Sequence, residues 1–278
     1  MIQVIATTPY TDQKMGTAGL RKKSKVVMQE HYFENFLQSI FNTIDPAGKT
    51  FVVGGDGRFY NSIAIQKLIK MAAANGVKKL IVGQNGFLST PASSNMILKR
   101  RTDGGFVLSA SHNPGGIDND FGVKYSDETG GQVPTSITDA IYRNSQTISE
   151  YKILEAPDID LGKIGVQKLE NMTIEVIDPI KDYVEMLEGI FDFEALKKLF
   201  KSGFTMKFDA MNAVTGPYGK RIFEEILGAA PGSVINAVPK PDFGGLHPDP
   251  NMVYAKELIG IMYGNDAPDF GSANDGDG

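Results

Sequence analysis

The sequence contains no cysteine, which excludes disulfide bonds and thiolate metal sites. It has no uninterrupted run of about 18 apolar residues and no apolar segment near its N-terminus, so we expect neither a membrane span nor a signal peptide. These absences predict a cytoplasmic protein. The formal net charge of −5 and the pI of about 5.3 argue against a general nucleic-acid binder.

Two nucleotide-binding motifs are also absent. The glycine-rich segment 54–58 follows a predicted strand, but Tyr60 stands where the third glycine of G-x-G-x-x-G belongs, so we reject a dinucleotide site there. No G-x-x-x-x-G-K-[ST] segment occurs, which leaves a P-loop nucleotide site without support.

Length and alternation of elements predict the fold class. With 278 residues, 41% of them hydrophobic, we expect two packed domains. An apolar stripe predicts a helix over 33–44, and residues 128–168 read as irregular. Between residues 51 and 110, strands and helices alternate: strand 51–53, helix 61–75, strand 77–82, a helix from residue 90, and strand 106–110. Asn61 and Thr90 are the expected N-caps of the two helices.

The same layout recurs in the second half. We expect its elements in this order: strand 204–209, helix 217–228, strand 234–235, helix 253–262, strand 270–273. The sequence therefore predicts an α/β fold of two consecutive modules, each a β-α-β-α-β sheet flanked by helices. The first module, residues 1–182, is expected to be complete, and the second, residues 183–278, to be truncated.

The segment 104–116, G-G-F-V-L-S-A-S-H-N-P-G-G, carries the first candidate functional residue. Ser111 leaves a predicted strand at its carboxyl end, and the N-P-G-G that follows His112 forces a turn. Open α/β sheets bind ligands at this edge. A Ser-His-Asp hydrolase has little support, because neighbouring side chains of an extended segment point apart and no G-x-S-x-G segment surrounds Ser111. His31 and His247 are expected to be structural.

Two further segments carry candidate ligands. Asp275 and Asp277 are two residues apart with glycine between them, so both carboxylates can converge on one hard divalent cation such as Mg²⁺. An acidic turn or the start of an EF-hand-like loop are the alternatives. Near the N-terminus, the glycines of G-T-A-G-L-R-K-K allow close approach to a ligand, and the Arg21 fork suits phosphate oxygens. A solvated basic loop is the other interpretation of that segment.

Taken with N-D-F-G-V-K, which ends at Lys124, these segments resemble the α-D-phosphohexomutase family, most closely its phosphoglucomutase branch. The resemblance implies a Mg²⁺-dependent exchange of phosphate between C1 and C6 of a hexose phosphate, with glucose 1,6-bisphosphate loading the serine. Ser111 would carry the phosphoryl group and ligate the metal together with Asp275 and Asp277. The remaining implied roles fall to four residues, with Lys124 assisting the proton of the accepting hydroxyl, His112 donating to the phosphate, and Thr17 and Arg21 binding substrate.

The resemblance also has a gap. The family pattern is D-G-D-G-D-R, and this sequence stops after Gly278, so the third Asp and the Arg are not in it. The family is a four-domain enzyme of about twice this length, so we expect an N-terminal half that is inactive alone. The sugar stays open, because a phosphomannomutase or phosphoglucosamine mutase fits the same residues. A non-catalytic scaffold or trafficking phosphoprotein is a further alternative, and the oligomeric state is not predicted.

Overall fold

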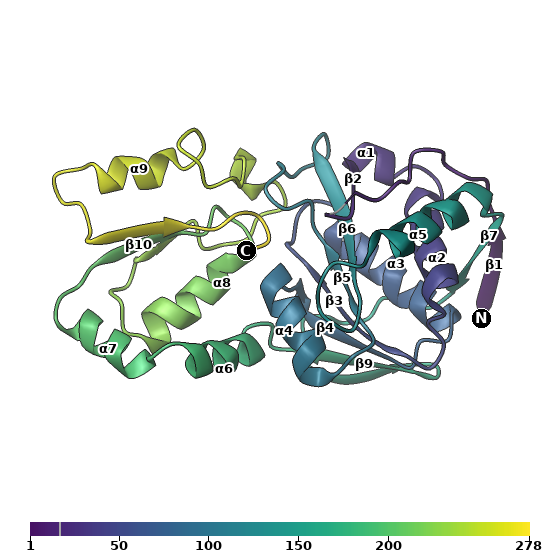
Figure 1. Cartoon of the computed structure of the whole chain (residues 1–278), viewed down its shortest axis with the longest axis horizontal. Coiled ribbons are helices and arrows are strands. Elements are labelled where there is room, and N and C mark those ends of the chain that lie inside the picture. Colours follow the sequence, from purple (N-terminus) through teal and green to yellow (C-terminus); the bar gives the residue numbers. More distant parts are fainter. Residues whose placement is uncertain (17) are drawn as a thin grey trace.

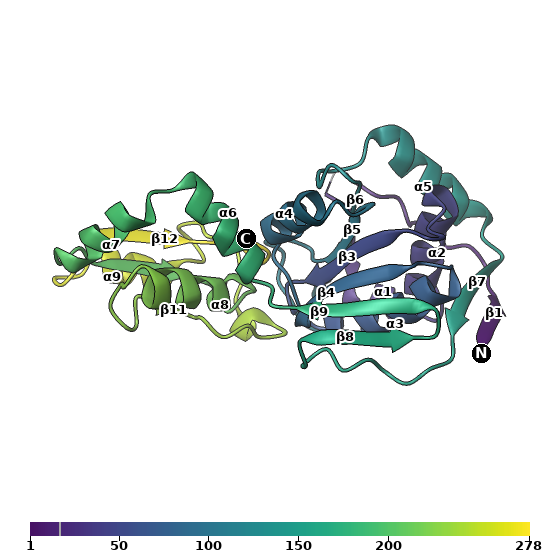
Figure 2. The same cartoon turned by 90° about the horizontal axis from the view of Figure 1, so that it is seen from below.

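The computed structural model describes residues 1–16 and 18–278. Its first module is built on a seven-stranded sheet, and Figures 1 and 2 show how the strands and helices are arranged. The central strands β5, β3, β4 and β9 run parallel, while β6 and β2 at one side and β8 at the other are antiparallel to their neighbours. In sheet order the strands are β2 (Leu20–Lys23), β6 (Asp120–Ser126), β5 (Gly105–Leu108), β3 (Thr50–Gly55), β4 (Lys79–Phe87), β9 (Met172–Ile177) and β8 (Gly165–Leu169).

Helices cover both faces of this sheet, as the alternation within β3 requires. Phe51 and Val53 pack in the core that includes α2 (Tyr32–Ile44) and α3 (Asn61–Ala74). Val52, between them, packs with residues of α4 (Thr90–Arg100) in a second core. Successive residues of a strand point to opposite faces, so this strand is buried from both sides. The predicted α/β class and the β-α-β-α-β order are therefore confirmed.

Three expectations about local structure were wrong. Residues 128–168 are not irregular, because they contain α5 (Thr135–Thr147) and β7 (Glu150–Leu154), and β7 pairs with the N-terminal β1 (Ile2–Ala6). The cap of α3 is Tyr60 rather than Asn61, and the Asn61 amide donates to the Leu108 carbonyl instead. The cap of α4 is Ser89, whose Oγ accepts from Ala92 N–H, so Thr90 already lies inside the helix.

The second module has a parallel sheet of order β11-β10-β12, with β10 central. Its strands are β10 (Met206–Asp209), β11 (Val234–Ile235) and β12 (Phe270–Ala273). Its helices are α6 (Lys181–Ile190), α7 (Phe193–Lys201), α8 (Thr215–Gly219), which continues as a π-helix over Lys220–Ile226, and α9 (Lys256–Met262). The predicted boundary at residue 182 falls at the start of α6 and stays a prediction.

The two modules meet where α4 packs against α6, and we call this contact the seam (Figure 2). Asp182 of α6 is 5% exposed and accepts hydrogen bonds from Lys99 Nζ (2.8 Å) and from Arg100 Nε and Nη2 (3.0 and 2.8 Å). At the other end of α4, Tyr218 Oη donates to the Pro179 carbonyl and accepts from Ser89 N–H. Both ends of α4 thus bind the second module. Over the described residues, no helix is both long and apolar enough to cross a membrane.

Candidate functional site

Ser111 lies three residues beyond the end of β5 in a left-handed backbone conformation, with φ of 52°. A non-glycine residue in this region is strained, which marks the position as one that its surroundings enforce. Its N–H donates to Ser109 Oγ at 2.8 Å, and its carbonyl accepts from Arg58 Nη2 at 2.8 Å. These bonds fix the backbone on both sides of the Ser111 side chain.

Arg58 is the residue that holds this loop, and the sequence analysis missed it. Its side chain is fully buried and forms an ion pair with the equally buried Asp56 at 2.8 Å. Besides the Ser111 carbonyl, it donates from Nη1 to the Asp120 carbonyl at 2.9 Å, and its guanidinium lies over the ring of Phe243 from the second module. The available signal was a charged pair in the G-G-D-G-R segment after a buried strand, where burial demands partners.

The Ser111 hydroxyl receives two cationic donors. Arg21 Nη2 lies 3.0 Å and Lys124 Nζ 2.9 Å from Ser111 Oγ. Arg21 comes from β2 and Lys124 from β6, which are paired neighbours in the sheet, so the register brings both side chains to one end. Arg21 Nε is buried and has no hydrogen-bond partner among the described residues. The serine oxygen therefore sits in a strongly positive environment.

The acidic loop of the second module reaches the same place. Asp277 is 4% exposed and forms a short ion pair through Oδ2 with Lys124 Nζ. Thr90 Oγ1 donates to the same Oδ2 at 2.7 Å, and Thr90 N–H donates to the Asp277 carbonyl at 2.9 Å. A Cβ on Gly276 would lie 2.4 Å from the Ser111 carbonyl, so only glycine permits the two loops to pass this closely. We call Ser111, Arg21, Lys124, Thr90 and Asp277 the Ser111 cluster.

The two carboxyl groups of this loop are perturbed in opposite directions. Burial, together with the charge of Asp277, raises the pKa of Asp275 to about 6. Burial also acts to raise the pKa of Asp277, but the Lys124 charge and hydrogen bonds from Lys124, Thr90 and Ser109 outweigh it and hold that pKa below its ordinary value. Two acids this close share a field that favours an additional cation.

The donor set fits a hard divalent cation. Asp275, Asp277 and Ser111 supply carboxylate and hydroxyl oxygens, which are the ligands that Mg²⁺ prefers, and Mg²⁺ ordinarily keeps several waters besides. The raised pKa of Asp275 indicates charge that such an ion would offset. Within residues 1–16 and 18–278, no group of three or more His, Asp or Glu side chains could hold a metal.

The predicted site residue His112 is not part of the cluster. The His112 side chain is exposed and makes no hydrogen bond to any described residue. Thr17 lies outside the described residues. A hollow of about 190 Å³ borders the cluster, and Lys124, Thr90, Ser94 and Gly19 are among its lining residues. A small polar molecule therefore has room beside the Lys124 ammonium.

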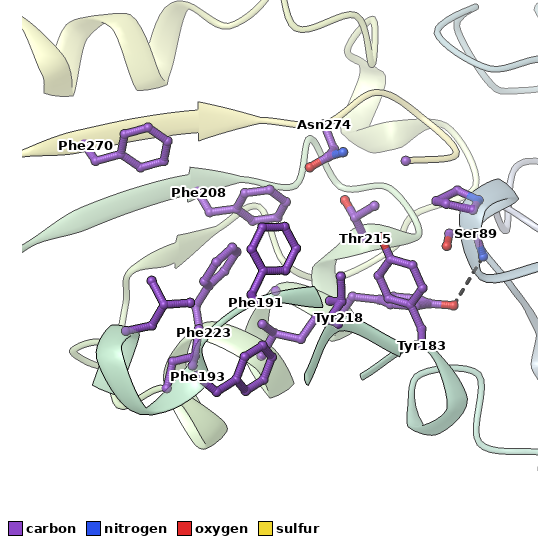
Figure 3. Close-up of a pocket in the computed structure, with 17 residues that line it drawn as sticks. Ser89, Tyr183, Phe191, Phe193, Phe208, Thr215, Tyr218, Phe223, Phe270 and Asn274 are labelled. Carbon is purple, nitrogen blue, oxygen red and sulfur yellow. Dashed lines mark hydrogen bonds between the residues drawn. The ribbon is translucent and has the colours of Figure 1, made fainter. Parts of the chain in front are cut away.

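A larger cavity of about 490 Å³ is lined mostly by the second module, with Ser89 and Pro91 of the first module also lining it (Figure 3). Aromatic rings of Phe191, Phe208, Tyr218 and Phe223 point into it, and none of the described residues that line it is charged. Its rim includes Asn274 and Gly278, so the acidic loop separates it from the Ser111 cluster. An apolar cavity without charged groups cannot hold a phosphorylated sugar, so the Ser111 cluster is the better candidate for the substrate site.

Comparison with known proteins agrees with this organisation. The profile of "Phosphoglucomutase/phosphomannomutase, alpha/beta/alpha domain I" matches residues 12–152, and that of domain II matches residues 181–278. A phosphoglucomutase of Rhizobium radiobacter is 57% identical over 100% of this chain and 52% of its own length. A chloroplastic phosphoglucomutase of Brassica napus is 53% identical over 100% of this chain and 45% of its own.

A solved structure gives the same result in three dimensions. The crystal structure of the exocytosis-sensitive phosphoprotein pp63/parafusin, a phosphoglucomutase from Paramecium, in its open form, aligns with a TM-score of 0.95 at 42% identity. The alignment covers 99% of this chain and 53% of that one. The chain thus spans about half the length of the relatives it matches.

Proposed function

The chain belongs to the phosphoglucomutase/phosphomannomutase family, and on that premise we propose that it carries the phosphoserine half of a phosphoglucomutase. The enzyme would interconvert glucose 1-phosphate and glucose 6-phosphate. The observation that supports this most is the single Lys124 ammonium that contacts both Ser111 Oγ and Asp277 Oδ2. It joins the hydroxyl of one module to the acidic loop of the other in a single site.

In the proposed reaction, phosphoserine 111 donates its phosphoryl group to the free hydroxyl of the sugar phosphate. The bond from phosphorus to Ser111 Oγ breaks, its electron pair stays on that oxygen, and the sugar oxygen forms the new bond. Arg21 and Lys124 both donate to Ser111 Oγ, so they stabilise the charge that develops there. The bound 1,6-bisphosphate then turns over, and Ser111 takes back the other phosphate.

Lys124 is the residue to which we assign proton transfer. The sequence suggested that it assists the proton of the accepting hydroxyl. Its contact with Ser111 Oγ favours the serine oxygen: Lys124 donates a proton there when the phosphoryl group leaves. When the phosphoryl group returns, Ser111 is itself the accepting hydroxyl, and the neutral amine removes its proton. In the first transfer, the neutral amine then takes the proton that the sugar hydroxyl releases. In the return transfer, Lys124 donates a proton to the sugar oxygen that leaves and takes the proton of Ser111, so each transfer ends with Lys124 charged.

Three further assignments belong to this proposal. Asp275, Asp277 and the serine oxygen would hold Mg²⁺, which when bound offsets the negative charge of the phosphoryl group. His112, exposed beside Ser111, would donate to the phosphate, and Thr17 would contact substrate. The protein is expected in the cytoplasm, as is one similar phosphoglucomutase that is named cytoplasmic. Another similar phosphoglucomutase is named chloroplastic.

The direct test is phosphorylation of Ser111. The 278-residue chain is incubated with Mg²⁺ and glucose 1,6-bisphosphate, digested, and analysed by mass spectrometry. We expect one phosphoryl group on the Ser111 peptide and none in S111A, whose fold should be unchanged. A single transfer needs only the Ser111 cluster, whereas net turnover needs the sugar phosphate to be held and reoriented, so we expect no appreciable mutase turnover by the chain alone. Label on S111A, or absence of label on the wild type, would contradict the proposal.

The same labelling separates the sugars and the non-catalytic alternative. Phosphorylated full-length protein is mixed with glucose, mannose or glucosamine 1-phosphate, and loss of the label is followed. Faster loss to the glucose phosphate is expected. Transfer only to mannose or glucosamine phosphates would reject the glucose assignment, and a label that no sugar phosphate removes would favour a scaffold phosphoprotein.

A further inference from the structure

The N-terminus of α4 offers a side chain that the reaction described above does not use. Ser89 caps the helix, with its Oγ accepting from Ala92 N–H at 3.2 Å. Thr90, the next residue, is therefore released from capping, and its hydroxyl is free to bind elsewhere. An N-cap hydroxyl normally satisfies a helix amide, so this one-residue shift changes what Thr90 can do.

Thr90 makes three contacts with the Ser111 cluster. Its Oγ1 donates to Asp277 Oδ2 at 2.7 Å and accepts from Lys124 Nζ at 3.4 Å. Its backbone N–H donates to the Asp277 carbonyl at 2.9 Å. One residue of the first module thus binds the acidic residue of the second module through both backbone and side chain.

We propose that Thr90 is a positioning residue that sets the orientation of the Asp277 carboxylate and the Lys124 ammonium relative to Ser111. The proposal rests on the proposed function, since it gives these two groups their task. Lys124 Nζ has three N–H donors, and its acceptors are Ser111 Oγ, Asp277 Oδ2 and Thr90 Oγ1. With all three in place, the ammonium has one orientation, and one of its protons points at the serine oxygen.

Removal of the Thr90 hydroxyl acts on both partners at once. Asp277 Oδ2 loses a donor and its carboxylate can rotate about its bond to Cβ. Lys124 loses an acceptor and can turn away from Ser111 Oγ. Groups that orient ligand carboxylates affect metal affinity although they do not touch the metal. Thr90 therefore acts through Asp277 and Lys124 and not by contact with substrate.

The test uses T90V, which keeps the side-chain shape without the hydroxyl, and T90S, which restores it. T43V is a matched control, because Thr43 Oγ1 also donates one hydrogen bond and accepts another, to Ser39 O and from Asn144 Nδ2, far from the cluster in α2. Mn²⁺ binding to the 278-residue chain is measured by the electron paramagnetic resonance of free Mn²⁺. We expect the dissociation constant to rise about 10-fold in T90V and to stay within about 2-fold in T90S and T43V.

A second readout follows the rate of Ser111 phosphorylation by glucose 1,6-bisphosphate. T90V should react about 10-fold more slowly at saturating bisphosphate, and T90S should be restored to near the wild-type rate. Equal Mn²⁺ affinities of T90V and wild type, or a T90S that is as impaired as T90V, would overturn the proposal. If T90V does not fold, T90A replaces it with the same expected results.

The two proposals fail in different ways. A wild-type chain that is never labelled on Ser111 contradicts the phosphoglucomutase proposal. A wild-type chain that is labelled normally, with T90V labelled equally fast, contradicts the role of Thr90 alone.

Discussion

The Ser111 loop and the acidic loop 274–278 meet in one site but are held there differently. The Ser111 loop is fixed by its own module, through Ser109, the buried Arg58 and the strand pair that carries Arg21 and Lys124. In the acidic loop, the Asp277 carboxylate accepts hydrogen bonds from the other module, through Thr90 and Lys124. The serine half of the site is therefore preorganised by its own module, whereas the carboxylate half depends on the seam.

Packing shows the same difference. Residues of the first sheet such as Val53 and Val82 are fully buried beneath helices. In the second module, Phe270 of β12 is 49% exposed and an apolar cavity of about 490 Å³ adjoins the same strand (Figure 3). The module with the exposed strand residue and the apolar cavity thus carries the carboxylates.

The largest expected effect comes from removing the internal support of Ser111. R58M leaves Asp56 buried without its partner and removes the donor to the Ser111 carbonyl. Breaking a buried ion pair in this way costs about 3–5 kcal/mol. Urea unfolding should show this loss of free energy, whereas R143M, at an exposed arginine, should change it little. If R58M is as stable as wild type, Arg58 does not provide the internal support of the Ser111 loop.

A smaller effect is expected from weakening the seam. D182N removes the charge that Lys99 and Arg100 bind across it, at a cost of about 1–3 kcal/mol for hydrogen bonds to a charged group. Hydrogen exchange should accelerate in α6 and in loop 274–278, while β3 and β5 keep their protection. E194Q, which removes an exposed ion pair within α7, is the control and should change neither region. Equal acceleration of hydrogen exchange in both modules would contradict the proposal that only the acidic loop depends on the seam.

The difference between wild type and D182N should depend on pH. Burial acts to raise the pKa of Asp182, but hydrogen bonds from Lys99 and Arg100 outweigh it and hold that pKa below its ordinary value. A depressed carboxyl pKa stabilises the folded state above the unfolded pKa of about 4 and loses this contribution as pH falls through the folded pKa. The stability difference should therefore be constant above about pH 5 and shrink in stronger acid. A difference that grows on acidification would contradict the assignment.

The smallest effect is expected from Y218F, which deletes one hydroxyl at the seam. The buried Tyr218 Oη donates to the Pro179 carbonyl and accepts from Ser89 N–H, the residue that caps α4. Its loss should lower the free energy of unfolding by about 1 kcal/mol. It should also weaken Mn²⁺ binding, but less than the loss of the Thr90 hydroxyl does. Y142F, at an exposed tyrosine contact outside the seam, is the control. Equal Mn²⁺ affinity and stability in both variants would limit the seam to the α4–α6 ion pairs.

The sequence predicted the parts of this molecule that depend on local pattern. The helical stripe of α2, the strand and turn around Ser111, and the paired Asp275 and Asp277 are all contiguous in the chain. The pairing of β1 with β7 was not predicted from the sequence, because the paired residues are about 150 positions apart and neither strand shows a strong alternation of apolar and polar residues. The contacts of Arg58 and Thr90 were not predicted for a related reason. Arg58 contacts Ser111 and Thr90 contacts Asp277, and no spacing in the sequence encodes either contact.

The central claim is that Ser111 and the Asp275–Asp277 loop form one site across the seam. The most direct measurement is a crystal structure of the 278-residue chain soaked in MnCl₂, with anomalous diffraction data. We expect one manganese peak bound by Asp275 and Asp277, next to the Ser111 hydroxyl. A peak elsewhere, or a structure in which Ser111 and Asp277 lie in separate clefts and do not share Lys124, would contradict it.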